Sequence, residues 1–372
     1  MKVTAVEART CVVPLDRDIA FATRAVRERH YTLVRVRTDT GAEGLGFCYG
    51  GTRGGALATL AVRELLRDCV VGRDPHLLES IWETMYREAL LQGRRGAVVR
   101  AIGAIDQALW DAVSREAGLP LHRYLGGYRE ETVPAYASGG YYAENKTPDD
   151  LAREVSEYID LGFDAVKIKV GGVSTQDDAR RIAAAREAVG PDVPLFLDAN
   201  NAWRDASSAI QAVREWEQWN PGWIEEPLMP DDVRGHAVVA KALATPVATG
   251  EIHATRWDFL DLIERRAAAV LQPDAGVCGG ITEWRRIAAL AAAHDITIAP
   301  HWLADLHVHL VAATPNAVWV EYFTNFSVLN IGRLFSTAPE IVPGGLALPQ
   351  SAGLGIELDD KAVSRYAVDD WQ

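Results

Sequence analysis

From about residue 130 onward, short apolar runs alternate with longer stretches in which apolar side chains recur every three or four positions. The short runs have the length and β-branched content of buried strands, and the longer stretches have the periodicity of amphipathic helices. Eight strands are predicted, at residues 133–137, 165–170, 195–198, 223–226, 247–251, 270–274, 297–301 and 318–321. Strands that alternate with helices at intervals of about 20 to 30 residues predict a β/α barrel.

The N-terminal part of the chain has a different pattern. Residues 3–13, 30–37 and 43–49 are strand-like, and a polar loop is expected at 16–28. Apolar residues at helical spacing follow in three stretches, at 56–66, 77–91 and 96–117. This pattern predicts an α+β domain before the barrel. Strand-like runs near 341 and 347 are expected to fold back onto that domain.

One predicted strand, at residues 165–170, alternates lysines with β-branched residues. Side chains two apart on a strand share a face, so Lys167 and Lys169 point the same way. Two ammonium groups held close together lower the pKa of at least one of them, and partial burial lowers it further. The strand alone fits an exposed edge with solvated lysines as well as a site with a neutral lysine base.

Seven consecutive predicted strands carry an ionisable side chain at their carboxyl ends. In chain order these are Lys167 with Lys169, Asp198, Glu225, Glu251, Asp274, His301 and Glu321. Barrels of this type hold their active sites at the carboxyl ends of the strands. We therefore expect these side chains to converge at one mouth of the barrel.

Three of these residues, Asp198, Glu225 and Glu251, come from neighbouring strands. Three carboxylates at close range repel one another by several kcal/mol unless a cation neutralises them. An oxygen-only ligand set favours Mg²⁺ over Ca²⁺ or Zn²⁺. Glu226 is expected to face away from Glu225, because successive strand residues point to opposite faces.

The remaining strand ends predict acid–base chemistry. Asp274 lies on the strand next to His301, where a carboxylate fixes the tautomer of an imidazole and raises its basicity. Lys169 and His301 are expected to flank a bound substrate. Glu321, if protonated in an apolar pocket, can donate a hydrogen bond to a substrate carboxylate. Together these groups favour removal of a proton next to a carboxylate through an enediolate, which a divalent metal stabilises.

The Lys-x-Lys strand, the three carboxylates, the His/Asp pair and the last glutamate resemble the enolase superfamily, specifically its mandelate racemase branch. The resemblance covers the whole chain. It implies an α/β fold with an N-terminal α+β capping domain at residues 1–126 and a modified TIM barrel of the (β/α)7β type at residues 127–330. Residues 331–372 then form a C-terminal segment that returns to the cap and completes it.

The resemblance also implies roles for the strand-end residues. Asp198, Glu225 and Glu251 bind Mg²⁺. Lys169 is the general base, and Lys167 assists it electrostatically. His301, oriented by Asp274, is the second acid or base, and Glu321 polarises the substrate carboxylate.

The stretches Trp-Ile-Glu-Glu-Pro-Leu at 223–228 and Ala-Pro-His at 299–301 look most like the acid-sugar dehydratases of this branch. The resemblance implies dehydration of an aldonate or aldarate to a 2-keto-3-deoxy acid. A racemase or epimerase of a 2-hydroxy acid, a sugar-lactone cycloisomerase and an inactive oligomeric binding protein remain as alternatives. A barrel glycosidase would leave the two lysines and the third carboxylate without a role.

Substrate recognition is expected in the cap loop and the first barrel loops. Arg24 and Arg27 can pair with the distal carboxylate of a diacid such as galactarate or glucarate. Tyr141 and Trp302 are candidates for the walls of the site, and Asn200 is a candidate to bind substrate or metal-bound water. A solvated loop and ordinary packing are the alternatives for these residues. His307 and His309 are expected to be structural, because residues two apart on a helix do not share a face.

Composition limits the class of partner. The 372 residues include 51 acidic and 38 basic side chains, a net charge of -13, which argues against nucleic acid as a partner. The four cysteines are far apart and have no metal-ligand spacing, so free thiols are expected. No apolar run is long enough to span a bilayer. We therefore expect a cytoplasmic enzyme that binds a small carboxylate, with no membrane partner, and the resemblance adds a homo-oligomer.

Overall fold

Eight parallel strands close into a barrel in the computed structural model, which describes all 372 residues except for the side chains of Arg17 and Arg24. The strands are β4 (Thr132–Gly139), β5 (Val166–Lys169), β6 (Leu195–Asp198), β7 (Trp223–Glu225), β8 (Val247–Thr249), β9 (Val270–Leu271), β10 (Thr297–Ile298) and β11 (Val320–Tyr322). They pair in chain order, β11 pairs with β4, and a bridge from Ile298 to Ala317 joins β10 to the segment before β11. All eight lie within or overlap the predicted strands.

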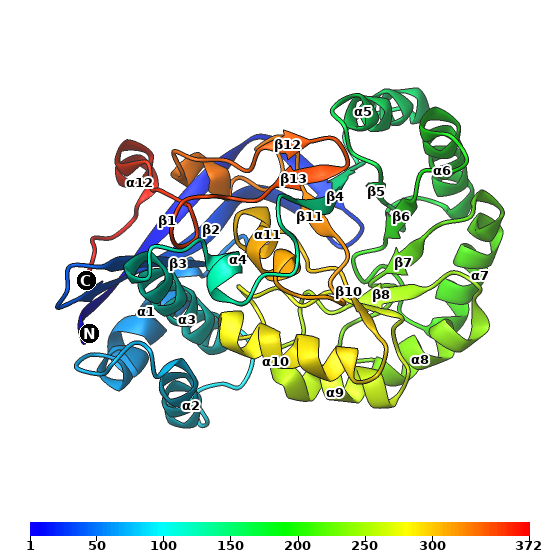
Figure 1. The fold of residues 1–372 in the computed structure, drawn as a ribbon. Coiled ribbons are helices and arrows are strands. Elements are labelled where there is room, and N and C mark those ends of the chain that lie inside the picture. Colours follow the sequence, from blue (N-terminus) through cyan, green and yellow to red (C-terminus); the bar gives the residue numbers. More distant parts are fainter.

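One helix follows each of the first seven barrel strands (Figure 1). These helices are α5 (Pro148–Asp160), α6 (Thr175–Val189), α7 (Ala206–Trp216), α8 (Val233–Ala242), α9 (Thr255–Glu264), α10 (Gly280–Ala292) and α11 (Ala304–Ala312). Helix α5 illustrates why they form: Thr147 and Asp150 make a capping box, Pro148 occupies the first turn, and Leu151 and Val155 are buried. The expected (β/α)7β barrel is confirmed.

A layer of apolar side chains fills the barrel below its carboxyl mouth. Phe196 and Trp223 stack with ring centroids 3.4 Å apart, and Tyr136 packs edge-on against both. Phe196 and Trp223 each precede a predicted site residue by two positions, so they share its face of the strand. The same alternation that fills the barrel core therefore brings Asp198 and Glu225 into the layer above.

The N-terminal domain places a three-stranded antiparallel sheet against helices (Figure 1). Its elements are β1 (Val3–Phe21), β2 (Arg24–Thr38), β3 (Glu43–Tyr49), α1 (Gly55–Ala61), a π-helical turn (Val62–Leu66), a 3₁₀ turn (Arg67–Cys69), α2 (Leu78–Glu88), α3 (Ala97–Glu116) and α4 (Leu121–Tyr124). Glycines in β3 allow α3 to approach closely: a Cβ on Gly46 would lie 1.9 Å from the Ala104 carbonyl oxygen. The expected α+β architecture is therefore observed.

The prediction of a polar loop at residues 16–28 was wrong. Strands β1 and β2 continue pairing as far as Phe21 and Arg24 and form a hairpin arm. The arm has few apolar residues because only one small patch is buried, where Ile19 and Val26 pack against Tyr141 of the barrel. The arm therefore brings the cap to the mouth of the barrel.

Helix α3 joins the cap to the loop between β9 and α10. The Asp106 carboxylate accepts hydrogen bonds from the backbone N–H and the hydroxyl of Thr282, at 2.8 and 2.6 Å. The Gln107 amide donates to the Ala275 carbonyl at 3.3 Å and accepts from the Phe47 N–H at 3.1 Å. Because Ala275 follows the predicted site residue Asp274, the cap supports that loop directly.

The C-terminal segment returns to both parts of the chain. The expectation that its strands fold onto the N-terminal domain was wrong, because they pair with a barrel strand. After a 3₁₀ turn (Ile331–Leu334), β12 (Ile341–Val342) and β13 (Gly345–Ala347) form a hairpin, and β13 pairs with β4. Helix α12 (Asp360–Tyr366) then leads to the cap, where the Asp369 carboxylate accepts from the Thr10 N–H at 2.7 Å. Both chain ends therefore lie beside the N-terminal sheet (Figure 1).

The cysteines are free, as the sequence predicts. Three of the four, Cys11, Cys48 and Cys278, are buried. Burial raises the pKa of the Cys48 thiol to about 11, so this group stays protonated and unreactive at neutral pH. Among the described residues, no helix combines the length and the apolar character needed to cross a bilayer.

The environment of His309 predicts that the junction between α4, α11 and the C-terminal segment is sensitive to acid. Its Nε2–H donates to the Leu354 carbonyl at 2.9 Å, and its Nδ1 accepts from the His122 N–H at 3.2 Å, so the neutral ring fits the site. Burial lowers the pKa of His309 to about 4 from 6.5. The folded protein therefore binds this proton less readily than the unfolded chain, and stability is lost as the pH falls below 6.5.

The free energy of unfolding of the natural protein should fall between pH 7 and pH 5, partly because of His309. In His309→Asn this fall should be about 2 kcal/mol smaller. Urea unfolding at the two pH values measures this difference. His294→Asn, which changes an exposed histidine beyond the end of α10, is the control for the substitution. If His309→Asn lost as much stability at pH 5 as the natural protein does, the pH dependence would come from other groups.

Candidate active site

Three carboxylates meet at the carboxyl ends of β6, β7 and β8. One oxygen each from Asp198, Glu225 and Glu251 lies within 4.8 Å of the other two. The parallel register pairs Asp198 with Glu225 and so sets these side chains at the same height in the barrel. Asp198 and Glu225 are fully buried, whereas Glu251 is partly accessible. The triad predicted from the sequence is therefore assembled.

The surroundings of the triad fit a hard cation. Burial and the Asp198 charge raise the pKa of Glu225 to about 8. Without a bound cation, the triad therefore does not hold three full negative charges at neutral pH. Two further buried oxygens, Asn200 Oδ1 and Glu226 Oε1, have no hydrogen-bond partner among the described residues. Carboxylate and amide oxygens are the ligands that Mg²⁺ prefers. Asp198, Glu225 and Glu251 are the residues that would hold it.

Both lysines of β5 point toward the triad. Lys167 is fully buried, and its Nζ lies 2.6 Å from Glu225 Oε1, 2.8 Å from Glu321 Oε1 and 3.6 Å from Asp198 Oδ2. Lys169 forms a hydrogen bond and ion pair with Asp198, and its Nζ lies 5.0 Å from the centre of the Tyr141 ring. Lys169 lines the cavity described below, whereas Lys167 lies beneath it.

The expected lowering of the lysine pKa values was wrong. Burial acts to lower the pKa of Lys169, but the Asp198 carboxylate outweighs burial, and the pKa is raised. The pKa of Lys167 is raised in the same way, by Glu225 and Glu321 against burial. The strand itself carries no acid, but its neighbours in the barrel supply three. Neutralising Asp198 is what would lower the pKa of Lys169 again.

His301 and Asp274 form the expected hydrogen-bonded pair. His301 Nδ1 donates to Asp274 Oδ2 at 2.9 Å, and the other ring nitrogen faces Glu251 Oε2 at 3.5 Å. Burial lowers the pKa of His301, but Glu251 and the bond to Asp274 outweigh it and raise the pKa to about 9. His301 is therefore protonated at neutral pH and can donate a proton from Nε2 toward the triad side of the cavity.

Glu321 differs from its predicted state. Burial alone would raise the pKa of this carboxyl, but Lys167 and His301 lower it to about 2, so Glu321 is ionised and not a hydrogen-bond donor. Its Oε2 accepts from the Trp302 backbone N–H at 2.9 Å. Glu321 is completely buried, and its charge acts on the site through Lys167.

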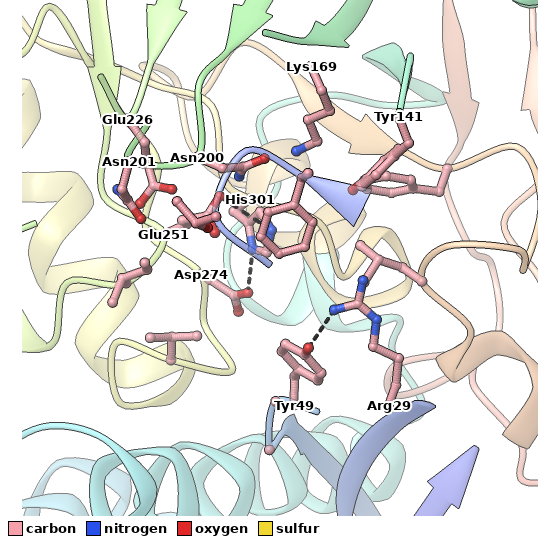
Figure 2. Close-up of a pocket in the computed structure, with 18 of the residues that line it drawn as sticks. Arg29, Tyr49, Tyr141, Lys169, Asn200, Asn201, Glu226, Glu251, Asp274 and His301 are labelled. Atoms are coloured by element: carbon pink, nitrogen blue, oxygen red, sulfur yellow. Dashed lines mark hydrogen bonds and ion pairs between the residues drawn. The ribbon is translucent and has the colours of Figure 1, made fainter. Parts of the chain in front are cut away.

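A cavity of about 300 Å³ lies between the barrel mouth and the cap (Figure 2). This volume is at the lower end of the ~300–1,000 Å³ that is usual for small-molecule sites. On the barrel side, the lining includes Tyr141, Lys169, Asn200, Glu226, Glu251, Asp274 and His301. On the cap side, it includes Phe21, Arg29, Tyr49 and Arg100. Lys169 and His301 therefore face one cavity next to the triad.

The substrate-binding candidates have different outcomes. Tyr141 and Asn200 line the cavity. Trp302 does not, because its left-handed backbone (φ 45°) turns the ring into the cap, where it packs on Tyr31 and Tyr49. The side chain of Arg24 lies outside the described residues. Arg27 was also expected near the substrate, but its side chain is 82% exposed and pairs with Asp18 at the surface.

Several cavity residues were not predicted, among them Glu226, Arg29 and Tyr49. Glu226 was expected to face away from Glu225, but its left-handed backbone (φ 41°) turns it into the cavity before Pro227. No sequence signal predicts this conformation, because a following proline favours extended backbone at the residue before it. Arg29 directly follows the segment that was taken for a loop, and Tyr49 ends the strand that was expected at 43–49. Neither could be placed at the cavity without the packing of the cap on the barrel.

His307 explains how the two loops that carry the His–Asp pair are held. Its Nδ1–H donates to the Trp302 carbonyl at 2.6 Å, and its Nε2 accepts from the Ala275 N–H at 3.0 Å. These are the residues that follow His301 and Asp274. The expected structural role of His307 is confirmed, and that role fixes the geometry of the pair.

The sequence matches the family model described as Mandelate racemase / muconate lactonizing enzyme, N-terminal domain, over residues 3–126. Residues 150–362 match the model described as Enolase C-terminal domain-like. The L-talarate/galactarate dehydratase of Salmonella typhimurium is 37% identical over 331 residues, which cover 89% of this chain and 81% of the relative.

Two further proteins are similar to almost the whole chain. The 3,6-anhydro-alpha-L-galactonate cycloisomerase of Streptomyces coelicolor is 33% identical over 357 residues, covering 96% of this chain and 97% of the relative. The crystal structure of L-talarate dehydratase from Polaromonas sp. JS666, complexed with Mg and L-glucarate, superposes with a TM-score of 0.89 at 35% identity. That match covers 100% of this chain and 98% of the other.

Proposed function

The chain belongs to the mandelate racemase and muconate lactonizing enzyme family of the enolase superfamily, and from its site we propose that it is a Mg²⁺-dependent acid-sugar dehydratase. The reaction removes the proton α to a carboxylate and expels the β-hydroxyl, which gives a 2-keto-3-deoxy acid. The observation that carries this proposal is the placement of Lys169 and His301 in one cavity, on strands either side of the triad.

In the proposed reaction, Lys169 and His301 move the two protons. Mg²⁺ held by Asp198, Glu225 and Glu251 supplies positive charge that stabilises the negative charge developing on the substrate carboxylate. Neutral Lys169 takes the α-proton onto Nζ. Protonated His301 gives its Nε2 proton to the departing β-hydroxyl, which leaves as water. The resulting enol becomes the ketone when its β-carbon takes up a proton.

The other charged residues prepare these two groups. Asp274 accepts the Nδ1 proton of His301 and so leaves Nε2 as the nitrogen that faces the substrate. Lys167 stays charged between Glu225 and Glu321 and adds positive potential below the substrate carboxylate. We propose that both act by positioning and electrostatics and do not exchange protons.

Assembly and compartment are part of the proposal. Exposed apolar side chains on the cap, including Leu57, Leu60 and Leu91, support a homo-oligomer, because large apolar groups at a surface are commonly covered. Free thiols support a reducing cytoplasm. Light scattering of the purified protein tests the oligomer.

A proton NMR assay in D₂O tests the reaction. The Mg²⁺-loaded protein is incubated with galactarate, L-talarate, L-glucarate, arabinonate and D-gluconate, which relatives are named for or crystallised with. Loss of the α-proton signal together with a new 3-deoxy methylene signal is expected for at least one acid. No turnover of any acid by the Mg²⁺-loaded protein would overturn the assignment.

A cycloisomerase is the second candidate, because one relative carries that name and the same first proton transfer begins both reactions. It would consume a lactone or anhydro sugar and give no β-elimination from the open acids. Exchange or epimerisation of the α-proton without a methylene signal would favour an epimerase. The same NMR spectra therefore separate the three outcomes.

His301→Asn is expected to separate the two proton transfers. Without an acid for the β-hydroxyl, dehydration should fall about 10³-fold, within the usual range for loss of a general acid. Exchange of the α-proton with D₂O, which Lys169 performs, should continue. Equal loss of exchange and dehydration would instead show that His301 removes the α-proton. His294→Asn on the surface provides the control.

A further inference from the structure

Two arginines on the cap side of the cavity have no carboxylate partner. Arg29 is 4% exposed, and its Nε donates to the Val328 carbonyl at 3.1 Å, while Nη1 donates to the Tyr49 hydroxyl. Arg100 donates from Nη1 to the Tyr49 carbonyl at 2.7 Å. Among the described residues, the hydrogen-bond acceptors of the two guanidinium groups are carbonyl and hydroxyl oxygens, and no ion pair joins either group to an acid.

This arrangement is incomplete for a buried cation. Removing a guanidinium from water is costly unless a counter-ion and hydrogen bonds replace the water. The Arg29 guanidinium carbon lies 5.3 Å from the centre of the Tyr49 ring. Burial acts to lower the pKa of Arg29, but the hydroxyls of Tyr49, Tyr31 and Tyr141 outweigh it and raise the pKa. An anion that enters the cavity would supply the missing partner, and a carboxylate matches the fork of a guanidinium in two parallel hydrogen bonds.

Arg29 lies opposite the catalytic groups. Figure 2 shows Arg29 and Tyr49 entering the cavity from the cap, with Lys169 and His301 on the barrel side and Tyr141 on the wall between. Lys169 Nζ lies 5.0 Å from the centre of the Tyr141 ring. The positive charge of Arg29 also acts on the Tyr141 hydroxyl. One elongated ligand can therefore meet a cationic group at each end.

We propose that Arg29, with Arg100 beside it, binds the distal carboxylate of a dicarboxylic acid sugar, so that this site selects aldarates over aldonates. The inference rests on the proposed function, because it takes the other carboxylate of the same substrate to lie at the triad. A monocarboxylic sugar would place a neutral hydroxyl against Arg29 and leave the buried charge unpaired. An enzyme discriminates strongly between two substrates when one of them leaves a buried charged group of the site without a partner.

The catalytic test compares a diacid with a monoacid. We expect the natural protein to have at least a tenfold higher kcat/KM for the preferred aldarate than for an aldonate. Arg29→Met should lower kcat/KM for the aldarate about 10- to 100-fold and leave the aldonate value nearly unchanged. Arg29→Lys keeps the charge but loses the forked guanidinium. Its kcat/KM for the aldarate should lie between those of the natural protein and Arg29→Met. Equal losses for both acids would overturn the proposal.

Arg27→Met is the matched control. Arg27 lies two positions along the same strand, but its side chain is 82% exposed and does not line the cavity. Its kinetic constants should equal those of the natural protein. If Arg27→Met reduced activity toward the aldarate as much as Arg29→Met does, the effect would belong to the net charge of the cap and not to Arg29.

A binding test separates this inference from the proposed reaction. Adipate and hexanoate have the same chain length and no hydroxyl to eliminate, and they differ by one carboxylate. Calorimetry with the Mg²⁺-loaded natural protein should show adipate binding at least tenfold more tightly, and Arg29→Met should remove that difference. If the natural protein does not distinguish the two acids, the inference fails whether or not any sugar is dehydrated. If it does distinguish them but no sugar reacts, the proposed function alone fails.

Discussion

Lys169→Met is expected to lower the rate of acid-sugar dehydration about 10⁴-fold, at the upper end of the range for loss of a general base. Methionine keeps most of the length of the side chain beside Tyr141 and removes only the group that takes the α-proton. Exchange of that proton with D₂O should disappear together with dehydration, because both begin with the same transfer. Proton NMR of the Mg²⁺-loaded variant measures both.

Metal affinity distinguishes loss of the base from loss of the metal site. Lys169 pairs with Asp198, so removing the ammonium group frees a carboxylate of the triad and should leave Mg²⁺ affinity equal or higher. Calorimetric titration with Mg²⁺ checks this. Lys241→Met, which changes an exposed lysine on α8, is the control for activity. A variant that still exchanges the α-proton at the natural rate would show that another group is the base.

The architecture and the strand-end residues could be predicted from the sequence because both follow from one periodicity. Phe196 with Asp198, and Trp223 with Glu225, are two apart on their strands, so an apolar layer fixes a polar layer above it. Parallel pairing in chain order then places the ends of neighbouring strands side by side. This is sufficient to assemble the triad and the His301–Asp274 pair without any knowledge of the loops.

The charge states could not be predicted, because they depend on distances between strands. Lys167 and Glu321 are far apart in the sequence, and only closure of the barrel between β11 and β4 places them 2.8 Å apart. That contact raises the pKa of Lys167 and lowers that of Glu321, the reverse of both expectations. A single strand shows which groups are present but not their counter-ions.

Local backbone geometry explains the other differences. Glu226 has a positive φ value, which rotates its side chain away from the direction that strand alternation predicts. Arg29 was missed for a different reason: it directly follows the segment that was taken for a loop, and its place at the cavity depends on the packing of the cap on the barrel. The cavity residues of the cap were therefore harder to predict than the strand-end residues of the barrel.

Lys167→Met is expected to lower the free energy of unfolding by about 3–5 kcal/mol in Mg²⁺-free buffer, the usual cost of removing one partner from a buried ion pair. The ammonium group is fully buried and lies against Asp198, Glu225 and Glu321. Methionine fills the space but leaves these carboxylates without their shared counter-ion. Urea unfolding monitored by circular dichroism measures the loss, with Lys241→Met as the surface control.

Magnesium and a second substitution test the cause of that loss. Saturating Mg²⁺ should stabilise Lys167→Met more than the natural protein, because a cation at the triad neutralises Asp198 and Glu225 and leaves only Glu321 unpaired. Adding Glu321→Gln to Lys167→Met should recover part of the remaining deficit, as a double-mutant cycle would show. If neither Mg²⁺ nor the second substitution narrowed the gap, the loss would come from packing around residue 167. In that case Lys167 would not be the charge that holds the triad and Glu321 together.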